Sequence, residues 1–274
     1  MRKINIKIED TKRFQFGDNW KSFLNTIDSE RIKIAEQSLK EKMGSINLEN
    51  KTFLDIGCGS GIFSLSAINL NANKVHSFDY DYDSVECAKY LKTNYKSNSN
   101  WTIEEGSVLD EDYIKSLGEF DIVYSWGVLH HTGNMFKALN NAAIPVKKGG
   151  ILFISIYNHQ GWKSRIWFKI KKMYNKNIVL KQFLKIPVFS YFIIGGLLID
   201  IFYYRLNPIL RYSEYKKHRG MSIYHDWIDW LGGFPFEYAK PETIFNFFKK
   251  KGFILEKLNT KNGHGCNEFI FRKI

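Results

Sequence analysis

The order of apolar and polar residues along the first half of this chain predicts strands and helices in alternation. Short apolar runs that predict strands lie at 52–56, 74–79, 101–105, 120–125 and 150–157. Segments with helical spacing of their apolar residues lie between them, at 61–70, 83–94, 111–117 and 134–143. We expect Asp83 or Ser84 to cap the second of these helices. Such alternation is typical of a parallel sheet with helices on both faces.

Both ends of the chain extend this pattern. Ser29–Met43 has the apolar spacing of an amphipathic helix, and Pro241–Lys251 predicts a helix that begins at a proline. Two further strand patterns, Phe253–Leu258 and Cys266–Arg272, are separated by the glycine-rich turn Lys261–Gly265. A helix followed by an antiparallel hairpin would complete a sheet of about seven strands. We therefore predict an α/β protein built as a three-layer sandwich with a mostly parallel sheet.

The alternation stops after Tyr157. Residues 159–220 are rich in Lys, Arg and aromatic residues, and Asp200 and Glu214 are their only acids. We therefore expect a helical insertion after the fifth strand. The predicted organisation is an N-terminal helical segment (1–44), a sheet domain (45–157 and 232–274) and a basic, apolar cap that contacts the substrate (158–231).

The apolar run Ile186–Tyr204 in this insertion is close to the shortest length that spans a membrane. Pro187, the pair Gly195-Gly196 and Asp200 interrupt it, which argues against a stable span. Two interpretations stay open. The segment is a helical lid over an active site, which we prefer, or it takes part in peripheral contact with an anionic membrane surface through residues 160–220.

Composition narrows the class of protein. The chain has 274 residues, 44% of them hydrophobic and 16% aromatic, as expected for a folded domain. A net charge of +12 favours anionic partners. The three cysteines show neither metal-ligand spacing nor a disulfide framework, so we predict no metal. The first residues lack the apolar core of a signal peptide, so we expect a cytoplasmic protein, with the inner face of the membrane as the alternative location.

A cluster of glycines follows the first predicted strand. Gly57, Gly59 and Gly61 come after Asp55 and lead directly into a helix, an arrangement that cradles a nucleotide because glycine allows close backbone approach. A dinucleotide-binding loop would carry its third glycine where this chain has Ile62, which argues against a nicotinamide-dependent oxidoreductase. Asp79 ends the second strand about twenty residues later, where an acid can accept hydrogen bonds from ribose hydroxyls.

The Asp-x-Gly-x-Gly-x-Gly pattern resembles motif I of class I S-adenosylmethionine-dependent methyltransferases. The run Phe120–His131, with its Phe-Asp-Ile-Val start and Leu-His-His end, is similar to small-molecule, type 11-like members of that class, including bacterial enzymes that decorate surface polysaccharides. The resemblance covers roughly residues 45–157 and 240–274. It implies a Rossmann-like methyltransferase fold, with S-adenosylmethionine as cofactor and S-adenosylhomocysteine as product. The cofactor-binding residues that it implies are Asp55, Gly57, Cys58, Gly59, Gly61, Asp79, Tyr80, Ser107, Val108, Leu109, Ser125 and Trp126.

Two pairs of residues are candidates for removing a proton from an acceptor hydroxyl. His131 is the preferred base because it follows the fourth strand and histidine titrates near neutral pH, and His130 is its rival. The second pair is His225 and Asp226, which lie in an aromatic segment with glycines and prolines nearby. For both pairs, a purely structural role stays open as the alternative.

These patterns predict a methyltransferase that acts at oxygen on a small-molecule, nucleotide-linked or carrier-linked acceptor, such as a precursor of a surface polysaccharide. The alternatives are a quinol methylase at the membrane surface, a nucleic-acid methyltransferase and a non-catalytic, membrane-associated protein that retains the fold. Enzymes that methylate base amines usually carry Asn-Pro-Pro or Asp-Pro-Pro where this chain has Ser125-Trp126-Gly127. Nucleic acid is therefore the disfavoured acceptor.

Overall fold

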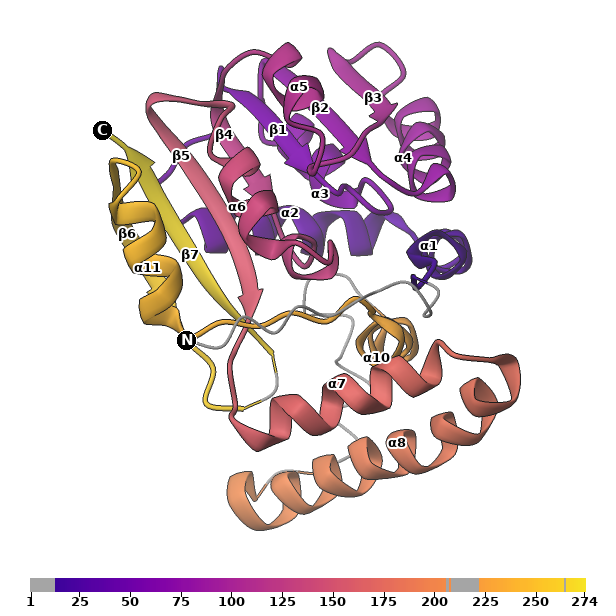
Figure 1. Cartoon of the computed structure of the whole chain (residues 1–274). Helices are drawn as coiled ribbons and strands as arrows, with labels where there is room; N and C mark the ends of the chain where they lie inside the picture. Colours follow the sequence, from indigo (N-terminus) through magenta and orange to yellow (C-terminus); the bar gives the residue numbers. More distant parts are fainter. Residues whose placement is uncertain (1–12, 206, 208–221, 264) are drawn as a thin grey trace.

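The computed structural model describes residues 13–205, 207, 222–263 and 265–274. Its described part contains one sheet of seven strands in the order β3-β2-β1-β4-β5-β7-β6 (Figure 1). The strands are β1 (Thr52–Ile56), β2 (Lys74–Asp79), β3 (Trp101–Glu105), β4 (Phe120–Ser125), β5 (Val146–Tyr157), β6 (Phe253–Asn259) and β7 (Cys266–Lys273). The first five run parallel, and β7 pairs antiparallel with both β5 and β6. The mostly parallel sheet with a C-terminal hairpin is confirmed.

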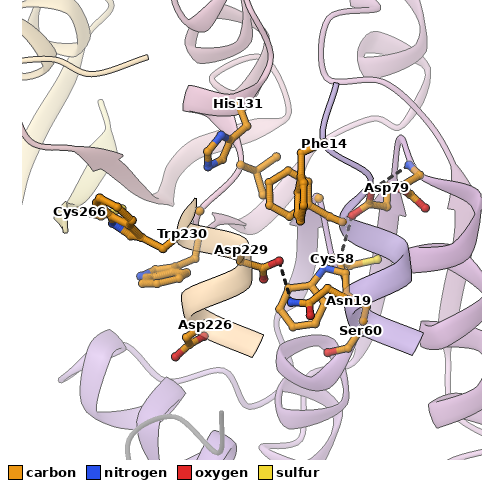
Figure 2. A pocket seen from close by; sticks show the side chains of 18 of the residues that line it. Phe14, Asn19, Cys58, Ser60, Asp79, His131, Asp226, Asp229, Trp230 and Cys266 are labelled. Atoms are coloured by element: carbon orange, nitrogen blue, oxygen red, sulfur yellow. Dashed lines mark hydrogen bonds between the residues drawn. The ribbon is translucent and has the colours of Figure 1, made fainter. Parts of the chain in front are cut away.

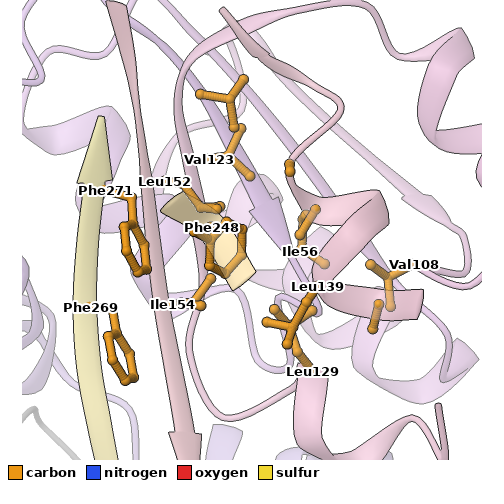
Figure 3. Packing of buried hydrophobic residues seen from close by; sticks show 14 of the residues in the cluster. Ile56, Val108, Val123, Leu129, Leu139, Leu152, Ile154, Phe248, Phe269 and Phe271 are labelled. Carbon is orange, nitrogen blue, oxygen red and sulfur yellow. The ribbon is translucent and has the colours of Figure 1, made fainter. Parts of the chain in front are cut away.

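Helices cover both faces of the sheet. They are α1 (Phe16–Leu24), α2 (Ser29–Met43), α3 (Ile62–Asn69), α4 (Tyr82–Tyr95), α5 (Glu111–Ser116), α6 (Met135–Ala142) and α11 (Pro241–Lys249). One apolar cluster joins one face of the sheet to α5, α6 and α11, and includes Ile114, Leu139 and Phe248 (Figure 3). A second cluster joins the opposite face to α1–α4 through residues such as Phe23 and Leu91. The predicted three-layer sandwich is therefore confirmed.

Strand order reverses at β1, which pairs with β2 on one side and β4 on the other. In an open parallel sheet, loops at the carboxyl ends of two such strands diverge and leave a crevice for a ligand. Gly57 follows β1 and Trp126 follows β4, so the motifs found in the sequence lie at this edge of the sheet.

Several element boundaries differ from the prediction, and two of the differences have a clear physical reason. Helix α4 begins at Tyr82 and is capped by Asp81, whose carboxylate accepts hydrogen bonds from the backbone of Asp83 and Ser84. The cap therefore precedes both predicted capping residues. Strand β5 begins at Val146 rather than Gly150, because Val146 pairs with β4 ahead of a register shift.

The predicted helical insertion after the fifth strand is confirmed, and Figure 1 shows it as a layer beside the carboxyl ends of the strands. It contains α7 (Trp162–Tyr174), α8 (Ile178–Leu198), the π-helical turn η2 (Ile199–Tyr204) and α10 (Ile223–Gly232). A third apolar cluster, centred on Trp167, Leu231 and Phe234, holds these helices together. The division of the chain into domains remains a prediction, and residues 208–221 of the insertion lie outside the described residues.

Candidate functional site

A cavity of about 2560 Å³ lies between the carboxyl ends of the strands and the helical insertion (Figure 2). One end is lined by the loops that follow β1, β2 and β3. The other end is lined by α10 and by the junction of α7 with α8. The cavity can therefore hold two ligands side by side, one on the sheet and one under the insertion.

The glycine loop has the geometry that close backbone approach requires. Gly57, Gly59 and Gly61 have φ values of 73°, 53° and 80°, which favour glycine. A Cβ atom on Gly57 would lie 2.5 Å from Val128, and one on Gly61 would lie 2.7 Å from Ala88. Gly57, Cys58 and Gly59 line the cavity, whereas Gly61 is needed because the chain packs closely on α4 there. The loop fits a nucleotide-like group held against backbone.

Two carboxyls flank this loop, that of buried Asp55 and that of half-buried Asp79. The Asp79 carboxylate accepts hydrogen bonds from the backbone N–H of Gly59 and of Asp81, each at 2.9 Å. Burial raises the pKa of Asp79 to about 6. Asp55 accepts a 2.5 Å hydrogen bond from the Ser64 hydroxyl, and burial raises its pKa to about 7. Both side chains line the cavity, so two carboxyls lie beside the glycine loop at the carboxyl ends of β1 and β2.

The loop after β3 also lies where the resemblance implies an adenine. Ser107, Val108 and Leu109 line the cavity, and Tyr80 lies on its rim with 63% of its surface exposed. The guanidinium of Arg13 lies 4.6 Å from the centre of the Tyr80 ring. This end of the cavity thus offers an aromatic ring and apolar side chains to a flat base.

The resemblance implies two cofactor contacts at the end of β4, Ser125 and Trp126. The structure differs from this expectation at Ser125. Its side chain is fully buried, donates a hydrogen bond to the Ile56 carbonyl at 3.1 Å and does not line the cavity among the described residues. It links β4 to β1 and has no room to contact a ligand. Trp126 does line the cavity, and its indole N–H donates to Glu268 at 2.8 Å.

His131 lines the cavity and has the geometry of a base (Figure 2). Its Nδ1 lies 2.7 Å from the carbonyl oxygen of Pro235. Because a carbonyl only accepts, Nδ1 carries the proton and Nε2 keeps a lone pair. Burial lowers the pKa of His131 well below its usual value, so the ring is neutral at physiological pH but does not titrate near it, which differs from the expectation from sequence.

His130 does not reach the cavity, which corrects its place as a rival base. The ring is fully buried, Nδ1 lies 3.2 Å from the Ser155 carbonyl, and the ring centre lies 4.1 Å from that of Tyr157. Its Nε2 has no hydrogen-bond partner among the described residues. His130 packs behind the loop that positions His131.

His225 and Asp226 point to different sides of α10. His225 is buried, with Nε2 3.1 Å from the Ser22 hydroxyl, and is absent from the cavity lining in the described part of the chain. Asp226 lines the cavity. The two side chains therefore do not act as a base and its orienting acid, because neighbours on a helix diverge by about 100°. His225 is a packing residue that ties α10 to α1.

The N-terminal segment contributes residues that the sequence analysis left without a role. Arg13 donates to the His131 carbonyl at 3.1 Å, and Phe16 lies 5.2 Å from the His131 ring centre. Asn19 on α1 donates to the Asp229 carboxylate on α10 at 2.8 Å (Figure 2). These contacts span more than 100 residues of sequence, so no local motif could reveal them. The only signal was the cluster of aromatic residues around Phe14 and Trp20.

The far end of the cavity is aromatic and carries lysines together with the carboxylates of Asp226 and Asp229. Lys176, Lys181 and Lys185 come from the start of α8 and the turn before it, and Trp227 and Trp230 come from α10. The C-terminal hairpin adds residues on both sides of its turn, including Lys261, Cys266 and Glu268, while His264 lies outside the described residues. This end presents aromatic faces and charges of both signs to a ligand.

Lys171 of α7 lies just behind this lining. Its ammonium group is buried 4.4 Å from the ring centre of Trp230 and 4.9 Å from that of Phe236. Burial lowers the pKa of Lys171 to about 7. Since Lys171 does not line the cavity among the described residues, we assign it to packing of the insertion.

Comparisons with known proteins agree with this geometry. A family model described as "Methyltransferase domain" matches residues 47–209, which is more than half of the chain. Among curated proteins, a ubiquinone biosynthesis O-methyltransferase of Coxiella burnetii is 26% identical over 208 residues, covering 73% of this chain and 82% of the relative.

Solved structures show the same fold. Magnesium protoporphyrin IX methyltransferase from Synechocystis, crystallised with bound S-adenosylhomocysteine, matches with a TM-score of 0.53 and 15% identity, covering 94% of each chain. An O-methyltransferase family protein from Burkholderia thailandensis matches with a TM-score of 0.57 and 12% identity, covering 97% of this chain and 65% of that one. At such low identity these two structures support the fold alone.

Proposed function

The chain belongs to the methyltransferase-domain family, and from that premise we propose that it methylates an oxygen of a small or carrier-linked acceptor. It is an S-adenosylmethionine-dependent enzyme. The observation that carries the proposal is the continuous cavity, which places the glycine loop and Asp79 at one end and His131 beside the acceptor end. S-adenosylmethionine supplies a methyl group on a sulfonium, which an acceptor oxygen attacks in line.

Four residues at the cofactor end bind different parts of the cofactor in this proposal. Asp79 accepts hydrogen bonds from the ribose hydroxyls, and the hydrogen bond that the Gly59 N–H donates to its carboxylate holds the loop in shape. Asp55 lies at the base of the loop, where its carboxylate accepts from the ammonium group of the cofactor. Tyr80 and Leu109 enclose the adenine.

His131 takes the proton of the acceptor hydroxyl. The hydrogen bond from Nδ1 to Pro235 selects the tautomer whose Nε2 is a proton acceptor, and the lowered pKa keeps that nitrogen free of a proton. The contact with Arg13 anchors the backbone of this residue. General-base assistance of this kind contributes about 10²–10⁴-fold to a rate.

The residues at the acceptor end favour an acceptor that has a ring or apolar part and an anionic group. A phosphorylated or nucleotide-linked precursor of a surface polysaccharide is such an acceptor. Trp227 and Trp230 offer stacking surfaces, and Lys181 and Lys185 offer charge. A quinol methylase is the second candidate, favoured by the name of the Coxiella burnetii relative.

The test is methyl transfer from radiolabelled S-adenosylmethionine to four probes: a catechol, a phosphorylated phenol, a sugar nucleotide and a short RNA. We expect transfer to one or more of the first three, with mass spectrometry placing the methyl group on oxygen. Transfer to RNA alone would refute a small-molecule acceptor. Absence of cofactor binding by calorimetry would refute the function as a whole.

A further inference from the structure

The outward face of α8 is apolar, although it faces solvent in the structure. Phe183, Ile186 and Ile194 are 71%, 72% and 55% exposed, and Val179 and Ile193 continue the same stripe. These residues follow one another at intervals of four, three, seven and one along the helix, and at about 100° per residue they fall on one face. A surface helix of a globular protein normally turns polar residues outward.

The opposite face of α8 is already occupied by the protein itself. Val188 is buried in the apolar cluster of the insertion, and Phe192 lies 5.6 Å from the Trp227 ring centre and 5.2 Å from that of Trp230. The helix is thus held against α7 and α10 by its inner face. The outer stripe is a second apolar face, which the described residues leave uncovered.

By length and composition alone, Ile178–Tyr203 could cross a membrane. Crossing would strip the aromatic contacts of Phe189 and Phe192 from α10 and would draw Lys181, Lys185 and the buried Asp200 into hydrocarbon. A helix that keeps its inner contacts can instead lie flat, with only the outer stripe in contact with lipid.

The positive charge of the insertion indicates which kind of surface the outer stripe of α8 would bind. Residues 159–205 contain nine Lys and Arg residues and one acid. Lys163, Arg165, Lys169 and Lys172 of the neighbouring α7 are all exposed, and so is Trp162. Basic residues beside apolar and aromatic ones are typical of a helix on an anionic membrane. A second copy of the chain would bring this basic insertion against itself, which like charges oppose.

We propose that the outer stripe of α8, defined as Val179, Phe183, Ile186, Ile193 and Ile194, lies in the headgroup boundary of an anionic membrane, with the exposed basic residues of the adjacent helix α7 supplying positive charge. Four α8 residues also line the cavity: Ile178, Lys181, Lys185 and Phe192. Docking through the stripe therefore brings α8, and the side of the cavity that it lines, to the lipid surface. An acceptor held in lipid would then enter the cavity along α8. This consequence rests on the proposed function.

The test is flotation of the full chain with vesicles made of equal parts phosphatidylglycerol and phosphatidylcholine, and with vesicles of phosphatidylcholine alone. We expect flotation with the first, and a marked loss with the second or in high salt. The double variant Phe183→Ser/Ile186→Ser should reduce flotation at least about tenfold. The matched control is Tyr90→Ser/Ile254→Ser, two exposed apolar residues on α4 and β6, which should float like the unchanged protein.

Three outcomes would overturn the proposal. The first is equal flotation of the stripe variant and the unchanged protein. The second is a dimer in sedimentation velocity that the stripe variant dissociates while neither protein floats, because a second copy would then cover the face. The third is resistance to alkaline carbonate extraction from cell membranes, which indicates a span. Calorimetry with S-adenosylmethionine on the same variants keeps docking separate from function, because loss of flotation should leave cofactor binding unchanged.

Discussion

The two ends of the cavity are built in different ways. At the cofactor end, Asp55, the glycine loop and Asp79 lie within 25 residues of sequence, and backbone N–H groups fix the Asp79 carboxylate. At the acceptor end, the lining comes from the N-terminal segment, the loop after β4, the junction of α7 with α8, and α10. Its packing consists largely of ring contacts such as Trp167 against Trp230 at 4.1 Å.

This difference follows from what each end binds. A cofactor of constant shape can be held by backbone geometry that a short glycine-rich segment encodes. An acceptor that varies between enzymes is held by side chains on separate helices, which can change independently of the sheet. The cofactor end should therefore respond sharply to single substitutions, and the acceptor end should respond sharply only at the base.

The largest effect is expected from His131→Asn. Removal of the base should lower kcat by about 100-fold or more while leaving the affinity for S-adenosylmethionine within about twofold. Steady-state kinetics with an active probe acceptor, and calorimetry with the cofactor, would measure the two quantities. His130→Asn is the matched control. It should lower the melting temperature and leave kcat within a few fold of the unchanged protein. A larger loss of kcat in the control would move the base away from His131.

The next largest effect is expected from Asp79→Ala. It removes the acceptor for the ribose hydroxyls and frees the backbone N–H of Gly59, so the affinity for S-adenosylmethionine should fall by about 100-fold, the loss expected from two charge-assisted hydrogen bonds. Calorimetry measures this change. Asp110→Ala is a suitable control because Asp110 also accepts from two backbone N–H groups, at the start of α5. It should cost about 1 kcal/mol of stability and leave the affinity unchanged.

The pH dependence of the cofactor end should have opposite signs for binding and for stability. Asp79 has a pKa of about 6 and Asp55 one of about 7, both raised from 3.8 by burial. Ionised carboxylates accept from the cofactor, so affinity should fall by up to about tenfold per pH unit between pH 7 and 6, where Asp55 alone takes up a proton, and by up to about 100-fold per unit below 6, where both do.

Without cofactor, the folded chain binds more protons than the unfolded chain between pH 3.8 and the raised pKa values. The contribution of these two groups to the free energy of unfolding should therefore grow as the pH falls through that window. Calorimetry and thermal melts at pH 5 to 8 would compare the two signs, and Asp79→Asn should flatten both. A cofactor affinity that rises toward pH 5 would contradict the assignment.

The smallest effect is expected at the basic rim of the acceptor end. Lys181→Gln/Lys185→Gln should raise KM for a phosphorylated acceptor by a few fold, since exposed charge pairs contribute about 0.2–1 kcal/mol each. KM for an uncharged acceptor and kcat should stay nearly unchanged. An equal change for charged and uncharged acceptors would show that these lysines shape the cavity rather than recognise charge.

Local sequence patterns were enough to predict the sheet, the glycine loop and the position of Asp79. Apolar runs of strand length and a glycine-rich turn are local patterns, and their physical meaning does not depend on the rest of the chain. The same holds for the insertion, whose composition departs from that of the sheet domain. Local patterns placed helix boundaries less well, because Asp81, Asp83 and Ser84 all have side chains that can cap a helix.

The packing of the helices and loops settles which candidate residues line the same cavity. His130 and His131 are neighbours in sequence, yet one ring packs on Tyr157 and the other donates to Pro235 at the cavity wall. His225 and Asp226 separate in the same way, because successive residues of a helix point to different sides. Arg13, Asn19 and Asp229 joined the site through contacts across more than 100 residues, which depend on how the helices pack rather than on any local pattern.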